Sequence, residues 1–331
     1  MAYDGKVMRR ALRQFESDKQ RRARLFAQRR TEIYKKVPRL LEIDALLRST
    51  MSQIIAGALQ KGQDPQRAIA AIRDNNLSLQ RERGRLLRDA GYPEDALEEK
   101  PACPLCRDSG YRESKMCRCL QAYYTREQIA ELSKLLPMGE ETFDTFSFEW
   151  YSSSVEGNYG RSPRAMAEHH FDVCRDYANQ FGSKSGNLLL FGNPGLGKTF
   201  LSACIARVVS EKGHSVVYDT ASNIFSQFES SKFRRFDDDD SSDDDVNRYK
   251  NCDLLIIDDL GTEMLTSFVQ STLYQIINGR LISGRKTIIS TNLSPEQIGK
   301  RYGTQILSRI EGEYEILPFI GKDIRLQKKM R

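Results

Sequence analysis

The sequence has no long apolar run. No window of its 331 residues approaches 18 consecutive apolar residues, so we expect no membrane-spanning helix and no membrane partner. The N-terminus also lacks an apolar signal core, because residues 1–39 are studded with Arg and Lys. A basic start is typical of a transit peptide too, but Asp4, Glu16, Asp18 and Glu32 interrupt it and argue against one. These absences predict a cytoplasmic protein.

Histidine is scarce, and none of the three histidines lies near the cysteines between 103 and 119. Four of the seven cysteines are crowded into one short stretch, which favours metal over disulfides. Cys103 and Cys106 have the spacing of a zinc ribbon, and Cys117 and Cys119 follow as a less usual C-x-C pair. Four thiolates at this spacing suit a tetrahedral Zn²⁺ with a structural role. A reduced loop without metal is the alternative.

Positive charge is concentrated at the N-terminal end. Residues 1–100 contain 22 Lys and Arg against 14 Asp and Glu, or +8, and the remainder sums to −2. Such a region suits a nucleic acid or an acidic protein surface, and a solvated helix face is an equally good explanation.

The first hundred residues read as a helical unit. Residues 6–35 permit one or two sparsely apolar helices, and after Pro38 apolar residues recur at spacings of three and four as far as Leu59. Residues 65–90 predict another helix. The apolar faces of these helices either bury one another or leave one face exposed for a partner protein.

A glycine-rich turn follows a short apolar strand at residues 188–191. Glycines let the backbone turn its N–H groups toward phosphate oxygens at the start of the next helix, expected at 198–211. Lys198 adds charge for the β- and γ-phosphates, and the Thr199 hydroxyl is a Mg²⁺ ligand. The stretch therefore predicts a P-loop made of Gly192, Asn193, Pro194, Gly195, Leu196, Gly197, Lys198 and Thr199.

A second apolar strand ends in two carboxylates. Asp258 and Asp259 follow residues 253–257, as in a Walker B motif. We expect Asp258 to hold Mg²⁺ through water and Asp259 to polarise the attacking water as general base. Adjacent acids that merely cap a helix are the alternative.

Three further side chains complete the predicted site. A strand at 286–290 runs into Asn292, whose amide would orient the water. Arg309 could reach the γ-phosphate bound to a neighbouring subunit, and Arg301 competes for this role. A surface salt bridge is the alternative for Arg309.

Helices and strands alternate through this half of the chain. A Gly-, Pro- and Ser-containing joint at 137–164 precedes a helix at 166–181, and further strands are expected at 215–218 and 315–318. The expected domains are a helical arm at 1–100, a cysteine knuckle and linker helix at 101–137, and an α/β domain at 138–331.

Together these motifs resemble the AAA+ helicase loaders of the DnaC/DnaI type, which are related to the transposition helper IstB. The resemblance covers roughly 138–331 and rests on the P-loop, on 254–261 with its Asp-Asp-Leu-Gly extension, on 290–293, and on Ser308-Arg309. It implies an α/β P-loop NTPase core, a parallel sheet flanked by helices, preceded by a small helical and zinc-knuckle domain. Only 13 residues follow Pro318, too few for a full lid domain.

The resemblance also implies roles and partners. Asn292 matches sensor 1, Arg309 the arginine finger, and Arg325 a contact like that of sensor 2. The implied function is ATP-dependent loading of a hexameric replicative helicase, with binding of single-stranded DNA and with slow, stimulated ATP hydrolysis that depends on self-association. The alternatives are an IstB-like regulator of transposition and a protein that holds ATP without hydrolysing it. The implied cofactors are ATP, Mg²⁺ and Zn²⁺.

An acidic run departs from this pattern. Phe233-Arg234-Arg235-Phe236 precedes seven aspartates within residues 237–245, where the family carries a DNA-contacting insertion. Aromatic and arginine side chains suit single-stranded DNA, but the aspartates repel its backbone. A solvated loop, or a tether that competes with DNA for the basic N-terminal region, are the other interpretations.

Overall fold

The computed structural model describes residues 3–50, 65–135, 141–155, 160–234 and 241–330. The chain forms two compact units, which are taken separately below: residues 1–13 with 118–331 form the first unit, and residues 14–117 form the second.

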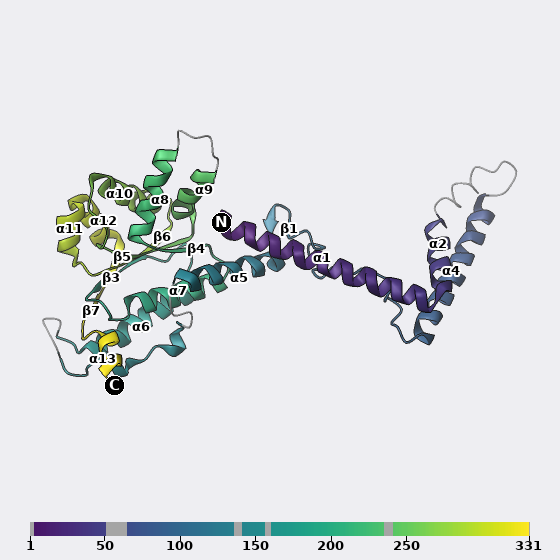
Figure 1. Ribbon diagram of the computed structural model, residues 1–331, viewed down its shortest axis with the longest axis horizontal. Helices are drawn as coiled ribbons and strands as arrows, with labels where there is room; N and C mark the ends of the chain where they lie inside the picture. The colour runs from purple at the N-terminus through teal and green to yellow at the C-terminus, as the bar shows by residue number, and fades with distance from the viewer. Residues whose placement is uncertain (1–2, 51–64, 136–140, 156–159, 235–240, 331) are drawn as a thin grey trace. The chain divides into compact units, whose positions relative to one another are not determined.

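A five-stranded, entirely parallel sheet is the centre of the first unit (Figure 1). Its order is β4-β5-β6-β3-β7. The strands are apolar runs buried on both faces, as parallel sheets covered by helices require. Their bounds are β3 Asn187–Gly192, β4 Val216–Thr220, β5 Leu254–Leu260, β6 Lys286–Thr291 and β7 Tyr314–Phe319.

Helices cover both faces of this sheet. Along β3, Leu188 and Leu190 face the cluster beneath α6 (Pro163–Asn179) and α7 (Lys198–Glu211), whereas Leu189 faces the opposite cluster. Figure 1 shows the two groups of helices on opposite sides of the strands. The opposite cluster is covered by α8 (Ala221–Arg234), α9 (Ser241–Asn251), α10 (Ser267–Ile282), α11 (Pro295–Tyr302) and α12 (Thr304–Glu313).

Shorter elements border this three-layered fold. Helix α5 (Arg118–Leu135) packs on α7, where Gln128 donates to the Ser210 hydroxyl at 2.6 Å. The 3₁₀ turns η1 (Phe143–Thr145) and η2 (Phe148–Trp150) precede α6, and α13 (Ile324–Met330) follows β7. Consistent with the prediction, the residues described after β7 form no full lid domain.

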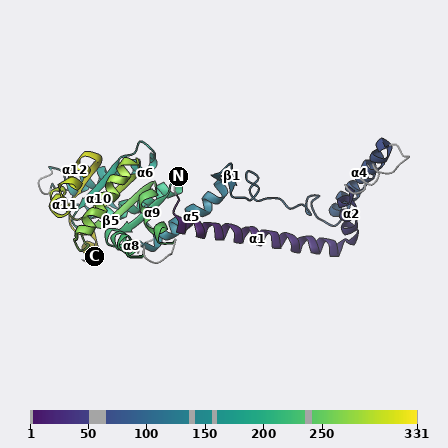
Figure 2. The same ribbon diagram turned by 90° about the horizontal axis from the view of Figure 1, so that it is seen from above.

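The second unit is mostly helical. Helix α1 (Gly5–Lys36) begins in the first unit and continues into the second, where α2 (Pro38–Arg48) and α4 (Pro65–Asp89) lie side by side (Figure 2). A short hairpin of β1 (Tyr111–Arg112) and β2 (Lys115–Met116) follows. The buried cluster of this unit is small and consists of Ile33, Leu40, Leu87, Ala96 and Leu97.

Most element bounds agree with the sequence. Helix α1 is one helix rather than two, and α4, α7 and β5 end within a few residues of their predicted ends. The helix expected after Pro38 is described as α2, and its predicted continuation from Met51 to Leu59 lies outside the described residues. Residues 235–240, which include the first four aspartates of the acidic run, also lie outside the described residues. Residues 241–245 contain the other three and form the start of α9, so this part is helix rather than loop. Within the described ranges, no helix is both long and apolar enough to cross a membrane.

Candidate nucleotide site and cysteine cluster

The glycine-rich turn between β3 and α7 has the backbone that a phosphate cradle needs. Gly192, Gly195 and Gly197 have φ values of 143°, 73° and 90°. A side chain at Gly195 would collide with the Asp323 carboxylate, and one at Gly197 would press on the Tyr151 hydroxyl. Glycine is therefore required here both by the left-handed backbone and by close neighbours.

Lys198 is held over this turn by main-chain and side-chain oxygens. Its ammonium donates to the carbonyls of Gly192 at 2.6 Å and Asn193 at 2.8 Å, and to Asn292 Oδ1 at 2.9 Å. Lys198 is only 5% exposed, and this burial lowers its pKa to about 8. A bound phosphate would stabilise the charged form of this amine and raise its pKa, so we expect the site to bind an anion favourably.

The two carboxylates lie at a β-bulge. Ile257 pairs with Ile289 and Leu260 with Thr291, so Asp258 and Asp259 together oppose a single residue of β6. In a regular strand two adjacent side chains point to opposite faces of the sheet. A bulge changes the direction of the side chains at this point of the strand. Asp259 takes a left-handed backbone, with φ of 53°.

The residue opposite the bulge is Ser290. Its hydroxyl donates to Asp258 Oδ1 and accepts from the Asp259 backbone N–H at 3.2 Å. The Tyr218 hydroxyl donates to Asp258 Oδ2 at 2.5 Å, and Thr199 Oγ1 lies 3.3 Å from Asp258 Oδ1. Asp258 is thus fixed from β4, β6 and α7, beside the hydroxyl that the sequence assigns to Mg²⁺.

Asp259 differs from its neighbour. Partial burial, and then the charge of Asp258, raise the pKa of Asp259 above the ordinary value. Its side chain is exposed, and it is the carboxylate of the pair that solvent can reach. Charges on Lys198 and Arg325 partly oppose the rise. A more basic, accessible carboxylate suits a group that takes a proton from water.

The three arginine candidates lie in different settings. Arg309 is exposed on α12, and the described part of the chain offers it no ion pair. Arg301 donates to the Glu263 backbone oxygen and lies 3.8 Å from its carboxylate. Arg325, next to Asp323, lowers the pKa of Lys198 through its charge. Arg301 is therefore held within its own chain, whereas Arg309 is free to reach outward.

Glu263 links the loop after β5 to the helices that carry these arginines. This buried carboxylate accepts from the Gly261 N–H at 3.0 Å and from the Tyr302 hydroxyl. Tyr302 ends α11, and α12 with Arg309 follows after Gly303. The loop beside the carboxylate pair and the arginine-bearing helices are therefore tied together.

Sequence reasoning did not assign a role to four of these neighbours. Tyr218, Ser290, Tyr151 and Asp323 meet the site from distant parts of the chain. Only the pairing of β5 with both β4 and β6 brings Tyr218 and Ser290 to Asp258. A weak signal existed for Ser290 alone, because it belongs to the 290–293 stretch and directly precedes Thr291 and Asn292.

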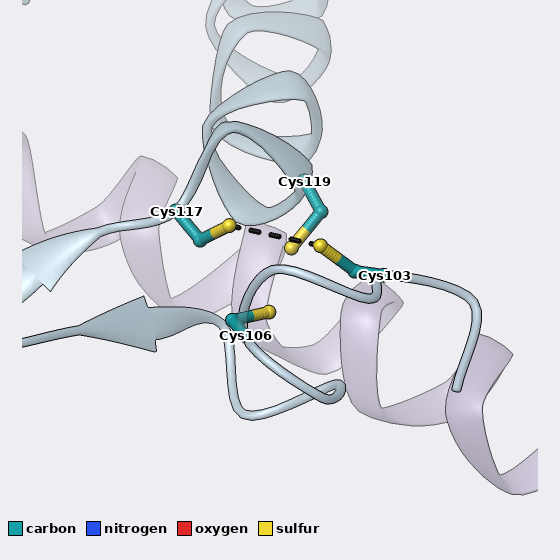
Figure 3. A group of neighbouring side chains, drawn as sticks. All are labelled: Cys103, Cys106, Cys117 and Cys119. Carbon is teal, nitrogen blue, oxygen red and sulfur yellow. Dashed lines mark hydrogen bonds between the residues drawn. The ribbon is translucent and has the colours of Figure 1, made fainter. Parts of the chain in front are cut away.

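The four crowded cysteines converge (Figure 3). The Sγ atoms of Cys103, Cys106, Cys117 and Cys119 all lie within 4.8 Å of one another, and those of Cys103 and Cys117 are 3.7 Å apart. Zn–S bonds of about 2.3 Å at tetrahedral angles place sulfurs about 3.8 Å apart. The thiolates therefore fit a Zn²⁺ ion, as the sequence predicts.

The turn that carries the first two cysteines is shaped to hold them. The Arg107 N–H donates to the Cys103 carbonyl at 2.9 Å, and Arg107 and Asp108 both have left-handed backbones. Burial opposes ionisation of Asp108, but N–H donors of Cys103 and Ala102 outweigh it and hold its pKa below the usual range. The carboxylate thus fixes the start of the knuckle.

Comparison with known proteins places the second half of the chain. The profile of a family described as "IstB-like ATP binding protein" matches residues 174–331. The replicative helicase loader DnaC of Escherichia coli (strain K12) is 29% identical over 164 residues, which cover 50% of this chain and 62% of that protein. The loader DnaI of Bacillus subtilis (strain 168) is 30% identical over 135 residues, or 40% of this chain and 41% of that protein.

Solved structures are also among the matches. A crystal structure titled as the DnaC helicase loader has 22% sequence identity, a TM-score of 0.44, and coverage of 54% of this chain and 97% of that one. The sequence matches span less than two thirds of the curated relatives. In sequence, residues 174–331 are therefore similar to the IstB-like ATP-binding family, and the matched relatives are the loaders DnaC and DnaI.

Proposed function

We propose that this protein is an ATP-dependent loader of a hexameric replicative helicase, in which ATP hydrolysis requires self-association. The proposal is supported by the named relatives and by one structural observation. Lys198 contacts Asn292 and Thr199 contacts Asp258 within one site, whereas Arg309 stands exposed on α12 and has no ion pair among the described residues.

Each residue of the site has a proposed task. Lys198 exchanges its carbonyl partners for phosphate oxygens, and Thr199 and Asp258 hold Mg²⁺, which neutralises phosphate charge when bound. Asn292 orients the attacking water and Asp259 accepts its proton. Arg309 from a neighbouring copy stabilises the charge that develops in the transition state.

Docking of the helicase is assigned to the second unit. Leu41 and Leu46 on α2 are 48% and 43% exposed, and Leu77 on α4 is 43% exposed. Exposed leucines on helices suit a protein partner, because the cores of protein interfaces are apolar. Binding of single-stranded DNA is proposed for the first unit, as in the family resemblance.

The test of self-association uses two inactive variants. Arg309→Ala should lower hydrolysis by about 10³-fold while nucleotide still binds, and Lys198→Ala should lose hydrolysis through its own site. When the two are mixed, the Lys198→Ala copy supplies Arg309 to an intact site, so activity returns in part. Arg301→Ala is the matched control, and we expect it to hydrolyse ATP without the addition of a second variant. No recovery in the mixture would contradict action between copies.

The test of the partner uses affinity capture from the native extract with ATP present. We expect the full chain to recover a replicative helicase, and Leu41→Asp with Leu46→Asp to lose it. The control is Ile282→Asp, which changes an apolar residue of similar size in the first unit. Ile282 is 80% exposed, and we expect this variant to retain the helicase. Recovery of a transposase instead would favour the IstB-like alternative.

A further inference from the structure

One face of α1 has a chemistry that neither the nucleotide site nor the leucines of α2 and α4 use. Its residues recur at spacings of three and four along one side of the helix, which is continuous from Gly5 to Lys36 (Figure 1). All are exposed. We call this the cationic face, and it consists of Lys6, Arg9, Arg13, Ser17, Gln20, Arg24, Gln28, Thr31 and Lys35.

The cationic face contains only cations and hydrogen-bonding side chains. Five of its nine residues are Lys or Arg, the others are Ser, Gln or Thr, and none is acidic. The three acids of α1, Glu16, Asp18 and Glu32, lie off this face. Its nine residues cover about 43 Å at 1.5 Å per residue.

The opposite side of α1 turns inward. Val7, Ala11, Phe15 and Ile33 are each at most 4% exposed, and they lie on the side of α1 opposite the cationic face. Between residues 16 and 32 other sides of the helix are exposed as well, so the cationic face is distinguished there by its residue types and not by burial.

Two cations elsewhere on α1 are paired with acids of other segments, whereas three on the cationic face are in no ion pair. Arg10 binds Glu127 and Glu131, and Arg22 binds Asp108. Among the residues that the structure describes, no ion pair involves Arg13, Arg24 or Lys35.

The absence of apolar residues decides the class of partner. Protein interfaces have apolar or aromatic cores and deplete Lys, and the cationic face offers neither an aliphatic nor an aromatic anchor. A phosphate backbone needs cations and hydrogen-bond donors spaced along a line, and needs no apolar anchor. We propose that the cationic face of α1 binds the phosphate backbone of a nucleic acid.

This binding separates two tasks within the N-terminal region. The leucines of α2 and α4 serve a protein partner, and α1 serves a polyanion. The inference does not rest on the proposed helicase function, since a nucleic acid would bind this face whatever protein docks on the leucines.

The test compares two triple variants of the full chain. The face triple is Arg13→Gln, Arg24→Gln and Lys35→Gln, and the control triple is Lys19→Gln, Arg29→Gln and Arg30→Gln. Both remove three exposed charges from α1, so they alter the net charge equally. Fluorescence anisotropy without nucleotide measures binding of labelled single-stranded DNA, duplex DNA and RNA, each long enough to cover the face, over a series of salt concentrations.

We expect the face triple to weaken binding by at least about tenfold. The slope of log affinity against log salt should become shallower by about 2 for a single strand or nearly 3 for a duplex, and by less than 1 in the control. The strongest of the three probes identifies the nucleic acid. Unchanged basal ATP hydrolysis and unchanged helicity in both triples establish that each still folds.

Three outcomes overturn the proposal. Equal losses in both triples would mean that only overall charge matters, and no loss in either would place nucleic acid elsewhere. Unchanged nucleic-acid binding in the face triple, together with loss of an acidic protein from affinity capture, would assign the face to that protein.

Discussion

The two units of this chain are held together by different means. In the first unit, two large apolar clusters lie on either face of a buried sheet. In the second, one small cluster of five residues is accompanied by ion pairs such as Arg83 with Asp44 at 2.8 Å, and three of the four converging cysteines belong to the same unit. A small apolar core supplies little stability, so metal and polar contacts must contribute more. The first unit therefore has the larger apolar core, and the second depends more on polar contacts.

Removal of the cysteine thiolates should have the largest effect, and it should be felt most in the second unit, which contains three of the four cysteines. Zinc-dependent folding carries about 10–16 kcal/mol of apparent binding free energy in small zinc-binding peptides. We expect metal analysis to find one zinc per wild-type chain and none in Cys103→Ser with Cys106→Ser, in which trypsin should cut rapidly at Arg107. Cys174→Ala, a buried cysteine of the first unit, is the control. A double variant that kept its zinc would refute the site.

A matched pair of leucines compares the two cores. Leu189 and Leu40 are both fully buried, and each change to alanine should cost about 2–5 kcal/mol, with Leu40 at the lower end because its small cluster can collapse more readily. The only tryptophan, Trp150, lies in the first unit. Its fluorescence during denaturation should therefore shift its midpoint for Leu189→Ala and not for Leu40→Ala. Equal shifts would mean that the two units unfold together.

Lys198→Ala should disable chemistry without disturbing the second unit. Loss of a buried cation that faces phosphate should lower the rate of ATP hydrolysis by at least about 100-fold. Lys212→Ala is the control, since Lys212 also donates to a main-chain carbonyl, that of Ala178, but at the far end of α7. Phosphate release measures the rate, and the zinc content of both variants should stay that of the wild type.

The smallest expected effect is a pH dependence of nucleotide binding. Burial lowers the pKa of Lys198 to about 8 in the free protein, and phosphate raises it again by favouring the charged amine. At a pH between the pKa of Lys198 in the free protein and its higher pKa in the complex, nucleotide binding is accompanied by protonation of Lys198. The affinity for nucleotide should therefore fall by up to about tenfold per pH unit as the pH rises above 8. Calorimetry in buffers of different ionisation enthalpy should detect the proton. Lys198→Arg should abolish the dependence, and a flat wild-type profile would contradict it.

The sequence predicted the nucleotide half well because its elements are encoded locally. The apolar runs of β3 and β5 and the glycines at 192, 195 and 197 each specify a conformation within a few residues. Figure 3 likewise shows the four cysteines meeting as their spacing predicts. The roles of the site residues, Asn292 and Arg309 among them, and the domain bounds at 137 and 138 remain predictions. The compact units defined by contacts are divided after residues 13 and 117.

Contacts between distant segments could not be predicted in this way. Tyr218 and Ser290 reach Asp258 only because β4 and β6 flank β5, and a single sequence does not specify strand order. The bulge at Asp258 and Asp259 is a matter of pairing between strands, and so has no local signature. The tie between Glu263 and Tyr302 likewise depends on how α11 packs beside the loop after β5.

The left-handed backbone at Asp259 limits how its role can be tested. Asparagine and aspartate tolerate this conformation better than other residues with a side chain, whereas alanine pays about 1–2 kcal/mol for it. An alanine variant would therefore remove the carboxylate and also strain or reshape the bulge that fixes Asp258. Asp259→Asn keeps the backbone and removes only the proton acceptor, so it is the variant whose loss of activity has a single meaning.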